Sequence, residues 1–235
     1  MRSRRAVLFA AAVVALSVAI TACSNSDGGT REPPAGGNLF PNPSFEEGRD
    51  PWYSLKPPDF ELAQDVAHSG QASALLRMSD SVEQAGTKIY YLVQEVAPQE
   101  FPEVISGYYR VDGWVKGTAK QYLQFVVIAF GPDNLTDAPN VQIRYLLAGI
   151  DAPPFPISNA KFVFLSRDEP VTGEWVHFQR NLREDFKQSW GAVPKGFDKL
   201  RILFEVRFDD KVAGQGAPRA DVHYDDLYMG PAGSE

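Results

Sequence analysis

Planar polar side chains recur at alternate positions in apolar runs of the second half of the chain. Alternation places residues of one parity on one face of a β-strand. Arginine, glutamate and glutamine present paired hydrogen-bonding atoms that match sugar hydroxyls, and aromatic rings stack on sugar C–H faces. The candidate ligand-binding residues are Gln142, Arg144, Arg201, Glu205, Arg207, Tyr122 and Trp190. The alternative is that this face is solvated, or is covered by the proline-rich segment 148–160.

Catalytic patterns are poorly represented. The chain has three histidines, none with His-Glu-x-x-His spacing, and it has neither a Gly-x-Ser-x-Gly elbow nor a glycine-rich phosphate loop. A glycosidase needs two carboxylates about 5–10 Å apart across a cleft, which a sequence does not reveal. We therefore expect a protein that is not an enzyme.

The first residues carry the signature of export. Three arginines precede an apolar run from Ala6 to Ile20, which is short for a membrane-spanning helix. The run ends Ile20-Thr-Ala-Cys23 and resembles the lipobox of bacterial lipoproteins. The resemblance implies cleavage before Cys23 and acylation of its thiol, and each buried CH₂ of the acyl chains contributes about 0.8 kcal/mol to membrane attachment. An ordinary signal peptide or an uncleaved anchor helix is the alternative.

These features predict where the parts of the chain lie. We expect a signal peptide at 1–22, a lipidated flexible tether at 23–37, a folded domain at 38–230 and a short tail at 231–235. The protein would be exported and anchored by lipid to the bacterial cell membrane or outer membrane. Loss of three arginines with the leader changes the net charge from −7 to −10. An acidic surface argues against nucleic acid as a partner.

Short apolar runs rich in β-branched and aromatic residues, separated by turn residues, predict an all-β fold. The expected strands are 73–77, 88–96, 108–116, 122–130, 141–147, 161–166, 175–181, 200–208 and 222–229. Only 184–190 has a helical pattern. Many short antiparallel strands indicate a two-sheet antiparallel β-sandwich, and the family resemblance given below implies its jelly-roll form. Since Cys23 is the only cysteine, no disulfide forms within the chain.

Five motifs in order carry a family resemblance. They are the opening Asn38–Gly48 with Trp52, the turn His68–Ser73, the run Tyr109–Gly117, Gly173–Trp175 and the closing Tyr224–Leu227. Together they resemble the calcium-containing jelly-roll carbohydrate-binding modules of families four, nine, sixteen and twenty-two, within the galactose-binding-like β-sandwiches. The resemblance implies polysaccharide or oligosaccharide binding, and it places Trp114 and Trp175 in the core.

Carboxylates near both ends of the domain predict a structural Ca²⁺ site. If the first and last strands were neighbours, Glu46 would approach Asp225 or Asp226, and a cation between them would remove the repulsion. The resemblance implies a set of ligands that adds oxygens near Ser44, His68 and Gln71. The alternative is that these are plain surface carboxylates.

Together these patterns predict a surface-tethered, non-catalytic carbohydrate-binding lipoprotein that holds glycan near the cell envelope. The alternative is a protein-interaction or envelope-assembly module on the same fold without sugar binding.

Overall fold

The computed structural model describes residues 37–79, 85–214 and 216–233, which lie within one compact unit of the chain, Pro33–Glu235. The predicted signal peptide, Cys23 and the tether lie outside these residues. In the described part, no helix is both long and apolar enough to cross a membrane.

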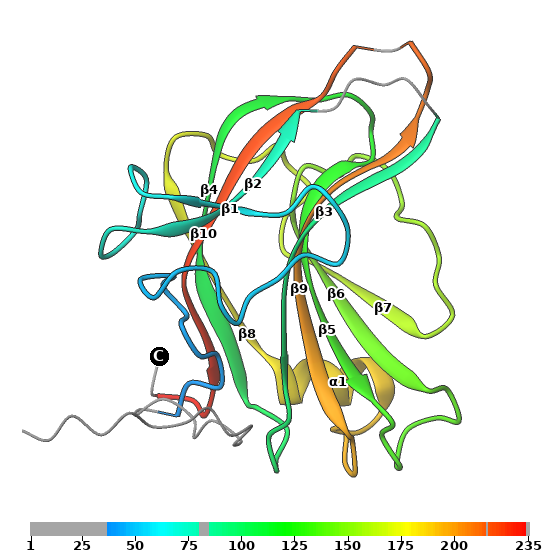
Figure 1. The fold of residues 1–235 in the computed structure, drawn as a ribbon. Helices are drawn as coiled ribbons and strands as arrows, with labels where there is room; N and C mark the ends of the chain where they lie inside the picture. Colours follow the sequence, from blue (N-terminus) through cyan, green and yellow to red (C-terminus); the bar gives the residue numbers. More distant parts are fainter. Residues whose placement is uncertain (1–36, 80–84, 215, 234–235) are drawn as a thin grey trace, which may run out of the picture. The chain divides into compact units, whose positions relative to one another are not determined.

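Two five-stranded β-sheets make up the fold (Figure 1). The first sheet consists, in spatial order, of β3 (Gly86–Val96), β9 (Lys199–Lys211), β5 (Gln121–Phe130), β6 (Asn140–Ala148) and β7 (Ala160–Phe164). The second consists of β1 (Glu61–Ala63), β2 (Ser73–Ser79), β10 (Arg219–Gly230), β4 (Val104–Val115) and β8 (Trp175–Asn181). The expected two-sheet β-sandwich is thus confirmed.

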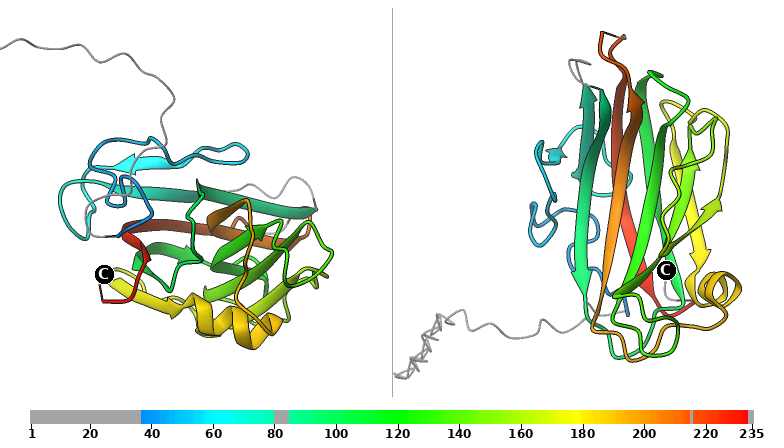
Figure 2. Two further views of the ribbon diagram at one scale, coloured as in Figure 1. Left: turned by 90° about the horizontal axis from the view of Figure 1, so that it is seen from below. Right: turned by 90° about the vertical axis from the view of Figure 1, so that its right-hand side faces the viewer.

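The core forms where alternating apolar side chains of both sheets meet. On β9, Ile202, Phe204 and Val206 are fully buried in this core, and on β10 Val222 and Tyr224 face them from the second sheet. Residues of the other parity on each strand therefore lie on the outer faces of the sandwich. The right-hand view of Figure 2 shows β3, β9 and β5 side by side, as the register of the first sheet requires.

One strand pairing differs from the expected antiparallel pattern. β7 pairs parallel to β6, with Arg144 opposite Phe162 and Leu146 opposite Phe164. The long connection 149–159, which contains three prolines, leaves β6 and carries the chain back to start β7 in the same direction. A tight hairpin forces antiparallel pairing, whereas a long crossover permits a parallel one.

The predicted helix is confirmed as α1 (Leu182–Trp190). Asn181 caps its N-terminus by accepting a hydrogen bond from the Glu184 N–H at 2.9 Å. Gly191 ends it in a left-handed conformation, with φ of 88°. The helix buries Leu182 and Phe186 against the core.

Candidate functional site

The outer face of the first sheet carries most of the residues that we predicted to bind ligand. Gln142, Arg144, Arg201, Glu205, Arg207 and Tyr122 all have the parity opposite to that of the core residues on their strands. In the register, Tyr91, Glu205 and Gln124 form one row across β3, β9 and β5, and Arg207 lies opposite Tyr122 in the next. The predicted polar face therefore exists.

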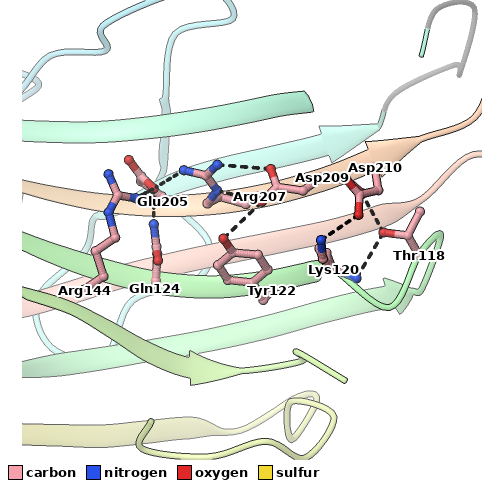
Figure 3. Close-up of polar contacts among 9 residues, drawn as sticks. All are labelled: Thr118, Lys120, Tyr122, Gln124, Arg144, Glu205, Arg207, Asp209 and Asp210. Carbon is pink, nitrogen blue, oxygen red and sulfur yellow. Dashed lines mark hydrogen bonds and ion pairs between the residues drawn. The ribbon is translucent and has the colours of Figure 1, made fainter. Parts of the chain in front are cut away.

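Arg207 is the centre of a buried polar network on this face (Figure 3). Its guanidinium contacts Glu205 at 3.3 Å on one side and Asp209 at 3.1 Å on the other. Tyr122 donates its hydroxyl to Asp209 at 3.1 Å, and the Gln124 amide donates to Glu205. Both carboxylates are nearly inaccessible to solvent, so an uncompensated charge here would be costly.

Arg144 is less well neutralised than Arg207. Its nearest carboxylate is that of Glu205, at 3.8 Å, and its Nε donates to Gln142 at 3.0 Å. Burial, together with nearby Arg207, lowers the pKa of Arg144 below its usual range, although Glu205 opposes that effect. β6 and β9 are not adjacent, since β5 lies between them, so Arg144 and Glu205 meet across an intervening strand.

Gln124 leaves a hydrogen-bond acceptor unused at the centre of this face. Its side chain is fully buried, yet its Oε1 has no hydrogen-bond partner. An unpaired buried acceptor costs about 1–3 kcal/mol unless a donor reaches it. Because this oxygen is itself inaccessible, it is an unsatisfied acceptor inside the network and not an open binding position.

A second ion-pair group lies at the end of the face where β9 begins. Glu95 accepts from Lys199 at 2.8 Å and from Arg201 at 2.7 Å. Tyr53 lies nearby and pairs with β3 through Val93, and burial and Glu95 raise the pKa of its hydroxyl. Tyr53 is 36% exposed, so this end of the face is open to solvent.

An open groove of about 420 Å³ borders the opposite edge of the face, along β7. Phe162 and Phe164 line it together with prolines of the segment 153–157. Both phenylalanines pack against Leu146, on the outer side of the sheet. The guanidinium of Arg167 stacks on Phe164, with its carbon 3.7 Å from the ring centroid. The predicted proline-rich loop thus forms one wall of a groove.

Several aromatic residues lie elsewhere than we expected. Trp190 is on α1 and packs against the core, with Lys161 over its ring at 5.0 Å. Lys161 and Phe162 are consecutive residues of β7, so their side chains lie on opposite sides of that strand. Trp190 is therefore on the side of β7 away from the polar face and does not belong to that face. Trp175, expected in the core, lies on the outer face of the second sheet, with its ring centroid 5.6 Å from that of His68. Trp114 does pack against the core.

Three aromatic residues that border the site were not among the predicted ligand-binding residues. Tyr91, Phe162 and Phe164 lie in runs predicted to be strands, and their parity within those runs assigns them to one face. The sequence of each run does not show which face of the strand is buried, because bulky side chains occur at both odd and even positions.

Three predicted metal ligands, Glu46, Asp225 and Asp226, each contact the turn 68–72. Glu46 lies in a loop before β1, and not on a first strand as we had assumed; Ser44 is two residues before it. The turn 68–72 brings it towards β10: Glu46 Oε1 accepts from the N–H groups of Gln71 at 2.8 Å and Ala72 at 2.9 Å. The carboxylate of Asp225 accepts from the His68 N–H at 2.7 Å.

The two adjacent aspartates have different environments. Asp225 is fully buried, and burial raises its pKa to about 6 despite the hydrogen bonds from backbone N–H groups. Asp226 is partly exposed and contacts His68 Nδ1 at 2.6 Å and the Ser69 hydroxyl at 2.7 Å. The ring of His68 stacks on Tyr108, with centroids 3.6 Å apart.

This donor set differs from the one that a calcium ion requires. Ca²⁺ takes six to eight oxygens, including backbone carbonyls. Here the turn presents N–H groups to Glu46 and Asp225, and those groups satisfy the same oxygens. In the described part of the chain, no group of three or more His, Cys, Asp or Glu side chains is arranged to hold a metal ion. Calcium at this position stays a prediction, and its binding requires the carbonyls of His68 and Gln71 to face the carboxylates.

A serine, a histidine and an aspartate also meet on the second sheet. Ser73 Oγ lies 3.1 Å from His223 Nδ1, and His223 Nε2 lies 4.0 Å from Asp112. Ser73 is fully buried and donates to the carbonyl of Val66 at 2.5 Å. Its oxygen is inaccessible and its proton is engaged, so the arrangement does not supply a nucleophile.

Comparison with known proteins finds likeness at the level of the fold. No family model matches the chain, and no curated protein matches it by sequence. The C-terminal family 22 carbohydrate-binding module of Clostridium thermocellum Xyn10B is 13% identical, with a TM-score of 0.46 over 87% of this chain and 99% of that one. TmCBM61, in complex with β-1,4-galactotriose, is 13% identical with a TM-score of 0.43 over 82% and 97%. The enzymatically active domain of bacteriophage CBA120 tailspike protein 4 is 14% identical, with a TM-score of 0.38 over 82% and 21%.

Proposed function

We propose that this chain is a non-catalytic protein that binds a polysaccharide or oligosaccharide on the outer face of the first sheet. One observation carries the proposal: planar polar side chains form cross-strand rows there, with aromatic rings at both edges of the sheet. Rings and paired donors are the groups that sugars require.

The same face is poorly suited to hydrolysis. A glycosidase places an acid and a second carboxylate on either side of the scissile bond. Here Arg207 lies between Glu205 and Asp209 and contacts both. The two carboxylates thus face an internal cation instead of a bond to be cleaved.

Attachment to the membrane through Cys23 is part of the proposal and rests on the leader sequence. The lipid would hold the domain, and any bound glycan, near the cell envelope. Cys23→Ala should accumulate as an unprocessed precursor that incorporates no labelled palmitate. Acyl labelling that persists in Cys23→Ala would refute the anchor, while leaving the binding face untouched.

A glycan array probed with the full chain tests the binding proposal. Two matched variants, Arg201→Gln and Arg110→Gln, test whether a bound glycan uses the outer face of the first sheet. Both arginines are 29% exposed in an ion pair, Arg201 with Glu95 on the first sheet and Arg110 with Asp112 on the second. We expect Arg201→Gln to weaken binding at least tenfold and Arg110→Gln to have no effect, with both melting temperatures nearly unchanged.

Two outcomes would contradict this proposal. Equal affinities for the two variants would place the site elsewhere. An array without any bound glycan would favour the alternative, a module that binds another protein.

A further inference from the structure

The outer face of the first sheet has a charge opposite to that of the whole chain. The complete sequence has a net charge of −7. The basic side chains of this face and its bordering groove are Arg144, Arg167, Lys199, Arg201 and Arg207. The acidic ones paired with them are Glu95, Glu205 and Asp209. Cations are therefore in excess on this face of an acidic protein.

Arg167 is the basic residue whose surroundings most clearly lack a counter-charge. Among the residues that the structure describes, no carboxylate forms an ion pair with it; the side chain of neighbouring Asp168 accepts one hydrogen bond, from the Ser166 hydroxyl at 3.5 Å. Its guanidinium stacks on Phe164, so the flat face of the group is occupied. The N–H donors lie in the plane of a guanidinium, and stacking leaves them directed outwards.

This arrangement prepares Arg167 for a planar anion. A carboxylate matches the guanidinium fork with two parallel hydrogen bonds. The stack on Phe164 also restricts the long side chain before any ligand arrives, which reduces the entropy lost on binding. A free phosphate would match the charge equally well, but the walls of the groove consist of Phe162 and prolines, which suit the C–H face of a ring.

Arg144 lies on β6, the strand next to the groove-lining β7. It is opposite Phe162 in the register, and Phe164 is two residues further along β7. Its nearest carboxylate, that of Glu205, is 3.8 Å away and is shared with Arg207. The volume of about 420 Å³ is within the range of about 300–1,000 Å³ typical of small-molecule sites. An anion in the groove would thus contact Arg167, with Arg144 on the adjacent strand.

We propose that this groove binds an acidic sugar, a uronic acid within a glycan, with its ring against Phe162 and the prolines and its carboxylate on Arg167. Arg144 contributes further positive charge at the side of the groove nearest the polar network. The inference rests on the proposed function and specifies its ligand class: an acidic glycan instead of a neutral one.

The test compares each glycan with an uncharged version of itself. Polygalacturonate, alginate and glucuronoxylan are each paired with their carboxyl-reduced form, which keeps the ring and linkage but replaces the carboxylate by a hydroxymethyl group. We expect the full chain to bind at least one acidic polymer ten or more times more tightly than its reduced form, with a preference that declines as salt rises.

Two variants assign that preference to the groove. Arg167→Gln should abolish it, because glutamine keeps the hydrogen bonding but not the charge. Lys161→Gln is the matched control: it removes a positive charge from the same strand on its opposite side, over Trp190, and should leave the preference intact. Unchanged melting curves exclude unfolding as a cause.

The outcomes distinguish the two proposals. Equal binding of acidic and reduced polymers, or a preference that survives in Arg167→Gln, overturns the acidic-sugar inference. Binding to neutral glycans alone overturns it as well and leaves carbohydrate binding standing. No binding to any glycan, charged or neutral, overturns both.

Discussion

The two outer faces of this sandwich each hold a cluster of carboxylates, and they stabilise negative charge in different ways. On the first sheet, Glu205 and Asp209 are paired with the guanidinium of Arg207. On the second, Asp225 and Glu46 accept hydrogen bonds from backbone N–H groups of the turn 68–72. The first cluster depends on residues from three strands, whereas the second depends on the conformation of one turn.

The difference has consequences for charge. Full cations compensate Glu205 and Asp209, so removing either partner leaves a buried charge unpaired. Amide dipoles compensate Asp225 only in part, and burial raises its pKa to about 6. In the arginine-held cluster, Glu205 and Asp209, the carboxylate charges are already neutralised by a cation. In the amide-held cluster, Glu46 and Asp225, they are neutralised only in part, so binding of a proton or a cation can still stabilise the fold.

The largest expected effect is from Glu205→Gln. Glutamine keeps the shape but removes the charge between Arg207 and Arg144. Breaking a buried pair from one side costs about 3–5 kcal/mol, which lowers the melting temperature by roughly 10 °C in a domain of this size. Glu61→Gln, in an exposed pair with Arg77, is the control and should cost less than about 1 kcal/mol. Equal losses of stability in the two variants would show that the buried network contributes no more than an exposed ion pair.

Calcium should act on the amide-held cluster alone. If the predicted ion binds, a hundredfold excess over its dissociation constant adds about 2.7 kcal/mol to the free energy of unfolding. Chelator should then lower the melting temperature by several degrees, and Glu46→Ala should abolish that difference. Glu205→Gln, although less stable, should respond to chelator as the wild type does. An unchanged melting curve in chelator, with no metal in elemental analysis, would count against the site.

Acidification probes Asp225 in the absence of calcium. Because its folded-state pKa is raised, the native state binds the proton more tightly than the unfolded state, and stability increases as pH falls through 6. Between pH 7 and pH 4 the gain is about 2 kcal/mol. Denaturant melts of wild type and Asp225→Asn in chelator should diverge by this amount over that range. With calcium bound, stability should instead decrease as pH falls, since the proton would have to displace the cation.

A smaller loss is expected from Gly70→Ala. Gly70 has φ of 64°, and an added Cβ would collide with the Glu46 carboxylate. The strain and the displaced hydrogen bonds should cost about 1–2 kcal/mol without any change of charge. Gly173→Ala is a matched control, since its φ is 81° but no atom lies within 4 Å of the added Cβ. If both variants lose the same stability, backbone strain alone explains the effect.

The local pattern of the sequence was sufficient to predict most strands and the sidedness of the polar face. Alternation along β9 separates Phe204 from Glu205 whatever the partners of that strand are. The turn 68–72 and the closing aspartates were likewise recognisable from their residue types, and the structure brings the turn into contact with both Glu46 and Asp225. These features depend on residues close together in sequence, for which side-chain type and spacing carry the information.

Strand order and the partners of buried charges were decided only by the tertiary structure. Gln124 lies opposite Glu205, 81 residues away, because β5 enters the sheet between β6 and β9. The parallel pairing of β7 places Phe162 beside Arg144 and thereby forms the groove. Such pairings minimise the energy of the whole sheet, and no period within a single strand specifies them. The sequence by itself therefore determined which side chains share a face, and only the packing of distant strands decided which of them meet.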